Sequence, residues 1–234
     1  MTNRKQIKTQ YSESDSHSKF IQNRVIHSPC SIGHQDTNQV EHPDQIIPPR
    51  QIRGLYDNKT IRVYQAYSDS IANAALTLGT FASPPFKMER MTWIKPSFLW
   101  MMYRAGWGFK DAGQSRILAI DISLEGFEWA LAHSCPSHPD DSMNKEEWIT
   151  LKENTPVRIQ WDPERNLYLE PQAHRAIQIG LSKQAVELYV NSWIQNITDI
   201  TPLAHNIYTL VQNNEIKKAK ELLPNERAYH ARHH

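Results

Sequence analysis

The sequence predicts an α+β fold that begins with mixed strands and helices and ends in helices. Two observations lead to this prediction. Apolar residues alternate with period two in segments such as 61–67, as in strands, and they recur at helical spacing after residue 185. The regular strand–helix alternation of a parallel sheet is not found, which favours the α+β class over the α/β class.

The boundaries of the expected elements follow from capping residues. Ser68 is a favoured N-cap, Gly79 is a favoured helix end, and Pro96 suits the first turn of a helix. The expected strands are 61–67, 91–95, 116–123, 157–161 and 176–181. The expected helices are 71–78, 98–103, 127–133, one whose apolar face runs from Val186 to Ile197, 203–213, and 214–223, which Pro224 ends.

Composition excludes several function classes. The 234 residues include 26 Lys and Arg against 25 Asp and Glu, so only a local basic groove, and no general electrostatic attraction, is compatible with nucleic-acid binding. No segment approaches the roughly 20 apolar residues of a spanning helix, and the first residues show no apolar signal segment. The two cysteines are too few for a disulfide scaffold or a cysteine zinc site. We expect a cytoplasmic protein without a metal.

Three regions are expected along the chain. Residues 1–48 are rich in Ser, Gln, Asn, His and Asp and contain one Phe and one Tyr. Such a segment buries too little apolar surface to offset the entropy of ordering, so we expect a disordered N-terminal arm. Residues 49–227 are expected to form one domain, and 228–234 a flexible tail.

The segment 85–107 combines cations with aromatic rings. This combination suits a ligand that is both flat and anionic, such as a nucleotide. The alternative is that the rings belong to the core while the cations extend to solvent. The core is favoured for Trp100, whereas both interpretations stay open for Arg90 and Lys95. The cations are Lys87, Arg90, Lys95 and Arg104, and the rings are Trp93, Trp100, Tyr103 and Trp107.

A second candidate site is the segment RIQWDPER, 158–165. Gln160 lies on one face of the expected strand and Trp161 on the other. Asp162 and Glu164 follow in an expected turn, where the scaffold fixes polar side chains that a ligand can reach. An Asp-Pro turn with a surface ion pair is an equally open alternative.

Two further features have both a functional and a structural interpretation. Gln65 alternates with apolar residues in a strand, so it either satisfies a buried partner or binds a ligand. The segment 133–138 and the following Asp140 and Asp141 offer metal-ligand residue types. Nothing elsewhere completes a set of ligands, so a solvated loop is favoured for this segment.

Six segments together resemble one known family. IRVYQAYSDSIANAAL, PPFKMERMTWIKPSFLWMMYRAGW, LAIDIS, ALAHS, VRIQWDPER and HRAIQIGL are similar to the family of domain of unknown function 4291, over about 51–226. That name implies no activity. The strand ending in VYQAY, its helix ending in Gly79, and the step MTWIKPSFLWMMY also resemble ADP-ribosyltransferase-like domains, including DNA-modifying transferases of the DarT type.

The second resemblance implies a fold, a substrate and roles for residues. It implies an ADP-ribosyltransferase-like split β-sheet core and NAD as the substrate, without a metal. Glu164 would stabilise the oxocarbenium-like transition state while Gln160 hydrogen-bonds the ribose. Gln65 stands where this family usually has His or Arg, and Gln160 where it has a catalytic Glu. The residues expected to contact NAD are Gln65, Tyr67, Arg90, Lys95, Ser97 and Trp161, with Arg90 and Lys95 on the pyrophosphate and Trp161 stacked on a ring.

Two other function classes remain compatible with the sequence. One is a non-catalytic module that binds a nucleotide or single-stranded nucleic acid through the same cations and rings. The other is an interaction protein whose N-terminal arm recruits a partner. An acid near the floor of the binding cleft would favour the enzyme, and the sequence offers Asp121, Asp162 and Glu164.

Overall fold

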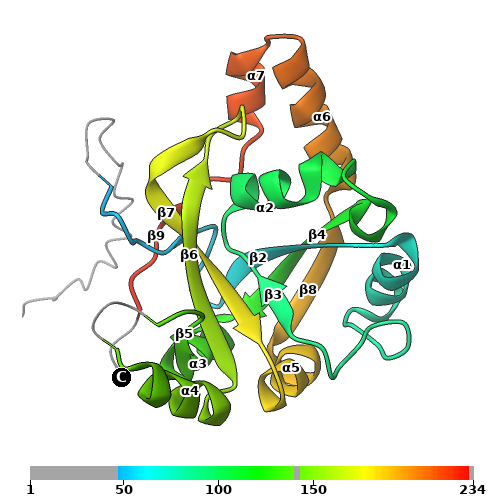
Figure 1. Cartoon of the computed structure of the whole chain (residues 1–234). Helices are drawn as coiled ribbons and strands as arrows, with labels where there is room; N and C mark the ends of the chain where they lie inside the picture. Colours follow the sequence, from blue (N-terminus) through cyan, green and yellow to red (C-terminus); the bar gives the residue numbers. More distant parts are fainter. Residues whose placement is uncertain (1–46, 140–142, 232–234) are drawn as a thin grey trace, which may run out of the picture. The chain divides into compact units, whose positions relative to one another are not determined.

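The computed structural model describes residues 47–139 and 143–231. The expected N-terminal arm lies outside these residues, except for Ile47 and Pro48, and so do Asp140 and Asp141. The described residues form mixed helices and strands, in agreement with the predicted mixture of α and β structure (Figure 1). Among them, no helix combines the length and the apolar character needed to cross a membrane.

Two sheets form the framework of the fold. The smaller sheet has the order β2-β4-β8 and the larger one β3-β7-β6-β5. All pairings are antiparallel except that of β5 with β6, and a short β1–β9 pair joins the beginning of the domain to its end. The strands are β1 (Arg53–Gly54), β2 (Thr60–Tyr67), β3 (Thr92–Ile94), β4 (Arg116–Ser123), β5 (Ser134–Pro136), β6 (Val157–Arg165), β7 (Pro171–Leu181), β8 (Ile194–Asp199) and β9 (Arg227–Ala228).

Helices surround these sheets. Figure 1 shows α2 and α6 at one end of the strands and α3, α4 and α5 towards the other end. The helices are α1 (Asp69–Leu78), α2 (Phe98–Ala105), α3 (Leu124–Ala132), α4 (Lys145–Asn154), α5 (Gln184–Leu188), α6 (Thr201–Gln212) and α7 (Ile216–Glu221), with a π-helical turn over Tyr189–Trp193 after α5.

Local sequence explains where α1 and α2 begin and end. Gly79 and Gly106 follow the two helices with positive φ angles of 73° and 56°, a conformation in which glycine has no side-chain clash. The Ser97 hydroxyl accepts the N–H of Trp100 at 3.1 Å, so Ser97 is the N-cap of α2. The sequence predicts Pro96 in the first turn of this helix, but Pro96 lies one residue before the N-cap.

The three-stranded sheet is buried on both faces. Val63 of β2 contributes to the core cluster between the two sheets, together with Ile120 and Ile179. The next residue, Tyr64, contributes to a second cluster that contains α2 and α6 residues such as Met102 and Ile207. Burial on both faces also explains the continuous apolar run Ile117–Ile120 of β4, whose residues alternate between the two clusters.

The two sheets are joined where β2 approaches the end of β3. The backbone N–H of Tyr64 donates to the carbonyl of Lys95 at 2.7 Å, in an isolated antiparallel bridge. Beyond this bridge the two strands do not pair with each other. Side chains from both sheets therefore face the space next to the bridge.

One segment after α5 was predicted as helix and forms a strand instead. The helical face expected from Val186 to Ile197 ends at Trp193, and the chain continues as β8, which pairs with β4. Ile197 lies directly opposite Ile120 of β4. An available strand edge, which sequence periodicity does not reveal, decides the conformation here.

Strand β6 is longer than predicted. It was expected to end at Trp161, with Asp162 and Glu164 in a turn, but it continues to Arg165. Pro163 is accommodated because the pairing with β7 shifts register between Pro163 and Arg165, where a proline without an N–H is tolerated. The Asp-Pro pair is therefore part of a strand.

The folded domain also extends beyond the expected boundary at residue 227. Tyr229 is only 6% exposed, and its N–H donates to the carbonyl of Ile52. Its ring packs edge-on against Tyr56 and Phe127. The first residues of the expected tail thus belong to the core. Helix α4 and strand β5 were not predicted at all.

Candidate functional site

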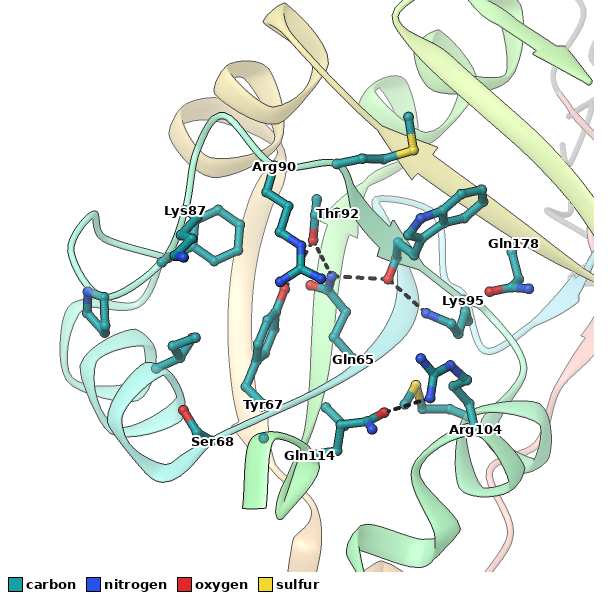
Figure 2. Close-up of a pocket in the computed structure, with 18 of the residues that line it drawn as sticks. Gln65, Tyr67, Ser68, Lys87, Arg90, Thr92, Lys95, Arg104, Gln114 and Gln178 are labelled. Carbon is teal, nitrogen blue, oxygen red and sulfur yellow. Dashed lines mark hydrogen bonds between the residues drawn. The ribbon is translucent and has the colours of Figure 1, made fainter. Parts of the chain in front are cut away.

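A cavity of about 600 Å³ lies beside the bridge between β2 and β3 (Figure 2). We call it the cleft. It is bordered by the end of β2, the segment before β3, β3 itself and α2, and it reaches β6 and β7. Its lining residues are Gln65, Ala66, Tyr67, Ser68, Ile71, Pro85, Phe86, Lys87, Arg90, Met91, Thr92, Trp93, Lys95, Met101, Arg104, Gly113, Gln114, Gln160 and Gln178.

The charged residues of the cleft are all cations. Within the described part of the chain, its lining contains Lys87, Arg90, Lys95 and Arg104 but no Asp or Glu. Arg104 donates to the side chain of Gln114 at 3.1 Å. Over the described residues, the side chains of Lys87 and Arg90 form no hydrogen bond or ion pair, and Figure 2 shows both labelled side chains at the cleft. Such cations favour an anionic ligand.

Gln65 is held by the protein on every side. Its amide nitrogen donates to the Thr92 hydroxyl at 2.8 Å and to the Trp93 carbonyl at 3.1 Å, and its oxygen accepts the hydroxyl of Tyr189 at 2.8 Å. Tyr67 also hydrogen-bonds Thr92, at 3.1 Å. Because the polar atoms of this buried glutamine are used, its role is to join β2 to β3.

Tyr67 forms one wall of the cleft. Its ring packs on Phe81 and Phe86, with centroids 5.1 Å and 6.1 Å away. Burial raises the pKa of the Tyr67 hydroxyl to about 12, so it is a neutral hydrogen-bonding group at physiological pH. An aromatic wall next to cations suits a ligand with a ring and a phosphate.

Lys95 is the most buried cation of the cleft. It is 6% exposed, and its Nζ donates to the carbonyl of Trp93 at 3.0 Å and lies 5.7 Å from the ring centre of Trp100. Burial, and secondarily the charge of Arg104, lowers the pKa of Lys95 to about 7, while the charge of Asp162 acts in the opposite direction.

Two carboxamides form the sheet side of the cleft, and a carboxylate outside its lining accepts hydrogen bonds from both. Gln160 of β6 and Gln178 of β7 are directly opposite each other in the sheet. The Gln160 amide donates to Asp162 at 3.0 Å, and the Gln178 amide donates to the other carboxylate oxygen. Asp162 thereby fixes the orientation of two amides that line the cleft.

Comparison with known families identifies the domain that carries this cleft. A family model described as "Domain of unknown function (DUF4291)" matches residues 51–229. The chain belongs to the DUF4291 family. This confirms the resemblance to that family which the sequence predicts, and the matched residues contain the cleft and both sheets. No curated protein matches the chain.

The DUF4291 domain holds Glu164 away from the cleft. Glu164 does not line it, and its carboxylate accepts the hydroxyl of Ser97 and the backbone N–H of Arg165, both at 2.8 Å. Burial raises the pKa of Glu164 above its ordinary value. Four residues of extended strand span roughly 13 Å, which is why Gln160 and Glu164 do not meet at one site.

Ser97 and Trp161 also lie outside the cleft of the DUF4291 domain. Ser97 caps α2 and donates to Glu164. Trp161 is partly buried against the core cluster between the sheets, on the side of β6 opposite Gln160, and it lines a second cavity of about 450 Å³ with Cys135 and His138. The expected contacts of these two residues with NAD are therefore not in this cleft.

Two residues of the cleft were missed by sequence reasoning. Thr92 bridges Gln65 and Tyr67, and Gln178 completes the amide pair. Outside the cleft, half-buried Glu226 accepts the backbone N–H of Phe98 at 2.7 Å and was also missed. Gln178, like Gln65, is a glutamine within an apolar strand, so the same pattern could have identified it. Glu226 lies in an irregular segment without any such signal.

The described residues contain no group of three or more His, Cys, Asp or Glu that would hold a metal ion. In the segment 133–138, His138 hydrogen-bonds the neighbouring Ser137, and the His133 ring lies on Trp129. Cys135 is buried and unpaired with another cysteine. These side chains are engaged with the protein itself.

Proposed function

We propose that the DUF4291 domain binds NAD in the cleft and transfers its ADP-ribose group to an acceptor. The observation that carries the proposal is the charge of the cleft, whose charged lining residues are all cations at the junction of two sheets. The cavity volume lies in the range typical of ligand pockets. The resemblance to ADP-ribosyltransferase-like domains supports NAD as the anion, and the two sheets would be the halves of such a core.

Different residues of the cleft would contact different parts of NAD. Lys87 and Arg90, whose side chains make no hydrogen bond within the described residues, would bind the pyrophosphate through charge-assisted hydrogen bonds. The aromatic wall with Tyr67 and Phe86 would contact a flat ring. Gln160 and Gln178 would hydrogen-bond ribose hydroxyls.

The reaction replaces one bond at the ribose by another. The bond between ribose C1′ and the nicotinamide nitrogen breaks, and its electron pair leaves with nicotinamide. A lone pair of the acceptor forms the new bond to C1′, and the acceptor loses a proton. A negative charge near C1′ stabilises the positive charge that develops there. Asp162, hydrogen-bonded to both Gln160 and Gln178, replaces Glu164 as the proposed source of that charge. The acceptor would be a nucleic-acid base, a protein side chain or a small molecule.

A second candidate function is a non-catalytic module that binds a nucleotide or single-stranded nucleic acid. The observation that favours it is the lack of an Asp or Glu among the described residues that line the cleft. Such a module needs the cations and aromatic wall alone. Both functions require that the cleft binds a nucleotide, but only the transferase breaks the bond between ribose and nicotinamide.

Calorimetric titration and an assay of nicotinamide release separate these functions. NAD, ADP-ribose and a short single-stranded oligonucleotide are titrated into the full chain. Release of nicotinamide is then measured with DNA, RNA and protein acceptors. Binding of NAD with release supports the transferase, and binding of a nucleotide or oligonucleotide without release supports the binding module. No binding of any of the three ligands would contradict both.

A further inference from the structure

The amine of Lys95 is buried with few partners in a cleft that attracts anions. The residue is 6% exposed, and among the described residues its Nζ donates one hydrogen bond, to the carbonyl of Trp93. It forms no ion pair with any described carboxylate, and Asp162, the acid whose charge acts on it, accepts hydrogen bonds from Gln160 and Gln178. A charged ammonium ion has three donors and needs more partners than this site offers.

The groups that face Lys95 come from each element around the cleft. The cation whose charge acts on Lys95 is Arg104 of α2, whereas Lys87 and Arg90, on the segment before β3, line the same cleft. Strand β2 contributes the neutral hydroxyl of Tyr67, and β6 contributes Asp162, the acid whose charge acts on Lys95. Arg104 and Asp162 act in opposite directions, so it is mainly the burial of the amine that favours its uncharged form when no ligand is bound.

We propose that, above about pH 7, Lys95 is uncharged in the ligand-free cleft and takes up a proton when an anionic ligand binds, so that it selects for anions and couples binding to pH. This inference rests on the proposed binding of NAD in the same cleft. A phosphate group brings negative charge and acceptor oxygens to the cations that surround the amine. Both stabilise the ammonium form.

The sign of the pH dependence follows from this coupling. In the empty protein the pKa of Lys95 is about 7, and a neighbouring anion raises it. Between pH 7 and the pKa of Lys95 in the complex, the complex then binds more protons than the free protein. Affinity for NAD therefore falls as pH rises, by up to about tenfold per pH unit between pH 7 and the pKa of Lys95 in the complex. Below pH 6 the amine is charged in both states, and this dependence vanishes.

Calorimetry in buffers of different ionisation enthalpy measures the proton uptake directly. NAD is a suitable probe because its phosphate diesters do not titrate between pH 6 and 9, unlike a terminal phosphate whose second pKa is about 6. At pH 8 we expect close to one proton taken up per NAD bound, and at pH 6 close to none. Lys95→Met should abolish the uptake, whereas Lys217→Met, at an exposed lysine of α7, should keep it. Binding of NAD at pH 8 without proton uptake would overturn the proposal.

A second measurement needs no binding of NAD. Lysine labelled with ¹³C gives an Nζ-sensitive Cε signal for Lys95, assigned by its loss in Lys95→Met. We expect this signal to titrate near pH 7 in the free protein and at a higher pH with inorganic pyrophosphate. An ordinary lysine titration in the free protein, or a midpoint that pyrophosphate leaves unchanged, would overturn the inference. A titration near pH 7 that shifts with pyrophosphate, in a protein that does not bind NAD, would support this inference and contradict the proposed NAD function.

Discussion

At the scale of single side chains, the cleft contains two kinds of polar residue. The Gln65 amide donates to the Thr92 hydroxyl and to the Trp93 carbonyl, so these residues hold β2 against β3. Arg90 and Lys87 have no such hydrogen bonds within the described residues and are exposed at the rim. We assign structural roles to the first pair and ligand binding to the second.

Replacing Arg90 by alanine should weaken NAD binding without unfolding the protein. Loss of one charge-assisted hydrogen bond costs roughly 1.5–3 kcal/mol, which is about tenfold or more in affinity. Calorimetric titration gives the affinity, and thermal unfolding gives Tm. Lys217→Ala, which removes a cation far from the lining of the cleft, is the control. Unchanged NAD affinity in Arg90→Ala would show that this guanidinium does not touch the ligand.

The roles of two acids are distinguished by a pair of amide variants. Asp162→Asn removes the charge that orients Gln160 and Gln178, and we expect nicotinamide release to fall by roughly 100-fold, as for loss of one preorganised electrostatic group. Glu164→Gln should change release little, because Glu164 hydrogen-bonds Ser97 and Arg165, neither of which lines the cleft. A larger loss of nicotinamide release in Glu164→Gln than in Asp162→Asn would assign the catalytic charge to Glu164, as the sequence alone indicated.

Sequence alone could identify the cations and Gln65 as candidates but not their roles. The glutamine stood out as a polar residue in an apolar strand, yet only the structure shows its partners Thr92 and Tyr189. Glu164 was selected because an Asp-Pro pair suggested a turn. Since β6 runs straight through Pro163, the side chains of the segment are spread along a strand instead of gathered at its end.

At the scale of elements, α2 connects the cleft to a pair of half-buried acids, Glu164 and Glu226. Its N-cap Ser97 donates to Glu164, and its first N–H, that of Phe98, donates to Glu226. Burial, and secondarily the charge of Glu164, raises the pKa of Glu226 well above its ordinary value. The opposite end of α2 carries Arg104 into the cleft. A change in the charge of Glu164 or Glu226 therefore acts on a helix that also lines the cleft.

The raised pKa of Glu226 predicts a loss of stability as pH rises. At low pH the carboxyl is protonated in both the folded and unfolded chains. As pH rises past its ordinary value of 4.5, the unfolded chain releases the proton first, so the free energy of unfolding falls until the folded-state pKa is reached. We expect Tm to fall between pH 5 and 7 by roughly 2–4 °C, the effect of about 1 kcal/mol in a domain of this size.

Glu226→Gln should reduce this fall, because its amide oxygen still accepts the Phe98 N–H without carrying a charge. Differential scanning calorimetry at pH 5 and pH 7 measures the effect. The control is Glu221→Gln, an exposed acid of α7. An equal fall in Tm in the wild type and in Glu226→Gln would assign the pH dependence to other groups.

Elements fixed by local sequence were predictable, and elements fixed by distant partners were not. The helix that ends at Gly79 and the strand 116–123 follow from period and capping residues, and the structure has both. Strand β8 was predicted as helix because its pairing with β4, far away in the chain, decides its conformation. The short β9 has too few residues to show any period.

At the scale of the whole molecule, the folded domain needs more of the C-terminus than its composition suggests. Tyr229 packs against Tyr56 and Phe127, and its N–H bonds the chain next to β1. At the other end, the carbonyl of Pro49 accepts the N–H of Arg175. The segments on both sides of the expected boundaries therefore contribute to the fold.

Truncated chains test these boundaries. A chain of residues 47–231 should keep the Tm of the full chain within a few degrees, because residues 1–48 offer little apolar surface. A chain of residues 47–227 should lose about 3–5 kcal/mol with the buried ring of Tyr229, a fall of roughly 10 °C in Tm. Circular dichroism melts compare the three chains. A large loss of stability in 47–231 would show that the N-terminal arm packs on the domain.

The central claim, that NAD binds in the cleft between β2 and β3, is tested most directly by a crystal structure of the full chain soaked with NAD. We predict the pyrophosphate within hydrogen-bonding distance of Lys87 or Arg90, and the nicotinamide ribose at Gln160 and Gln178. NAD bound elsewhere, for example in the second cavity beside Trp161, would contradict the claim, and so would an empty cleft at saturating NAD.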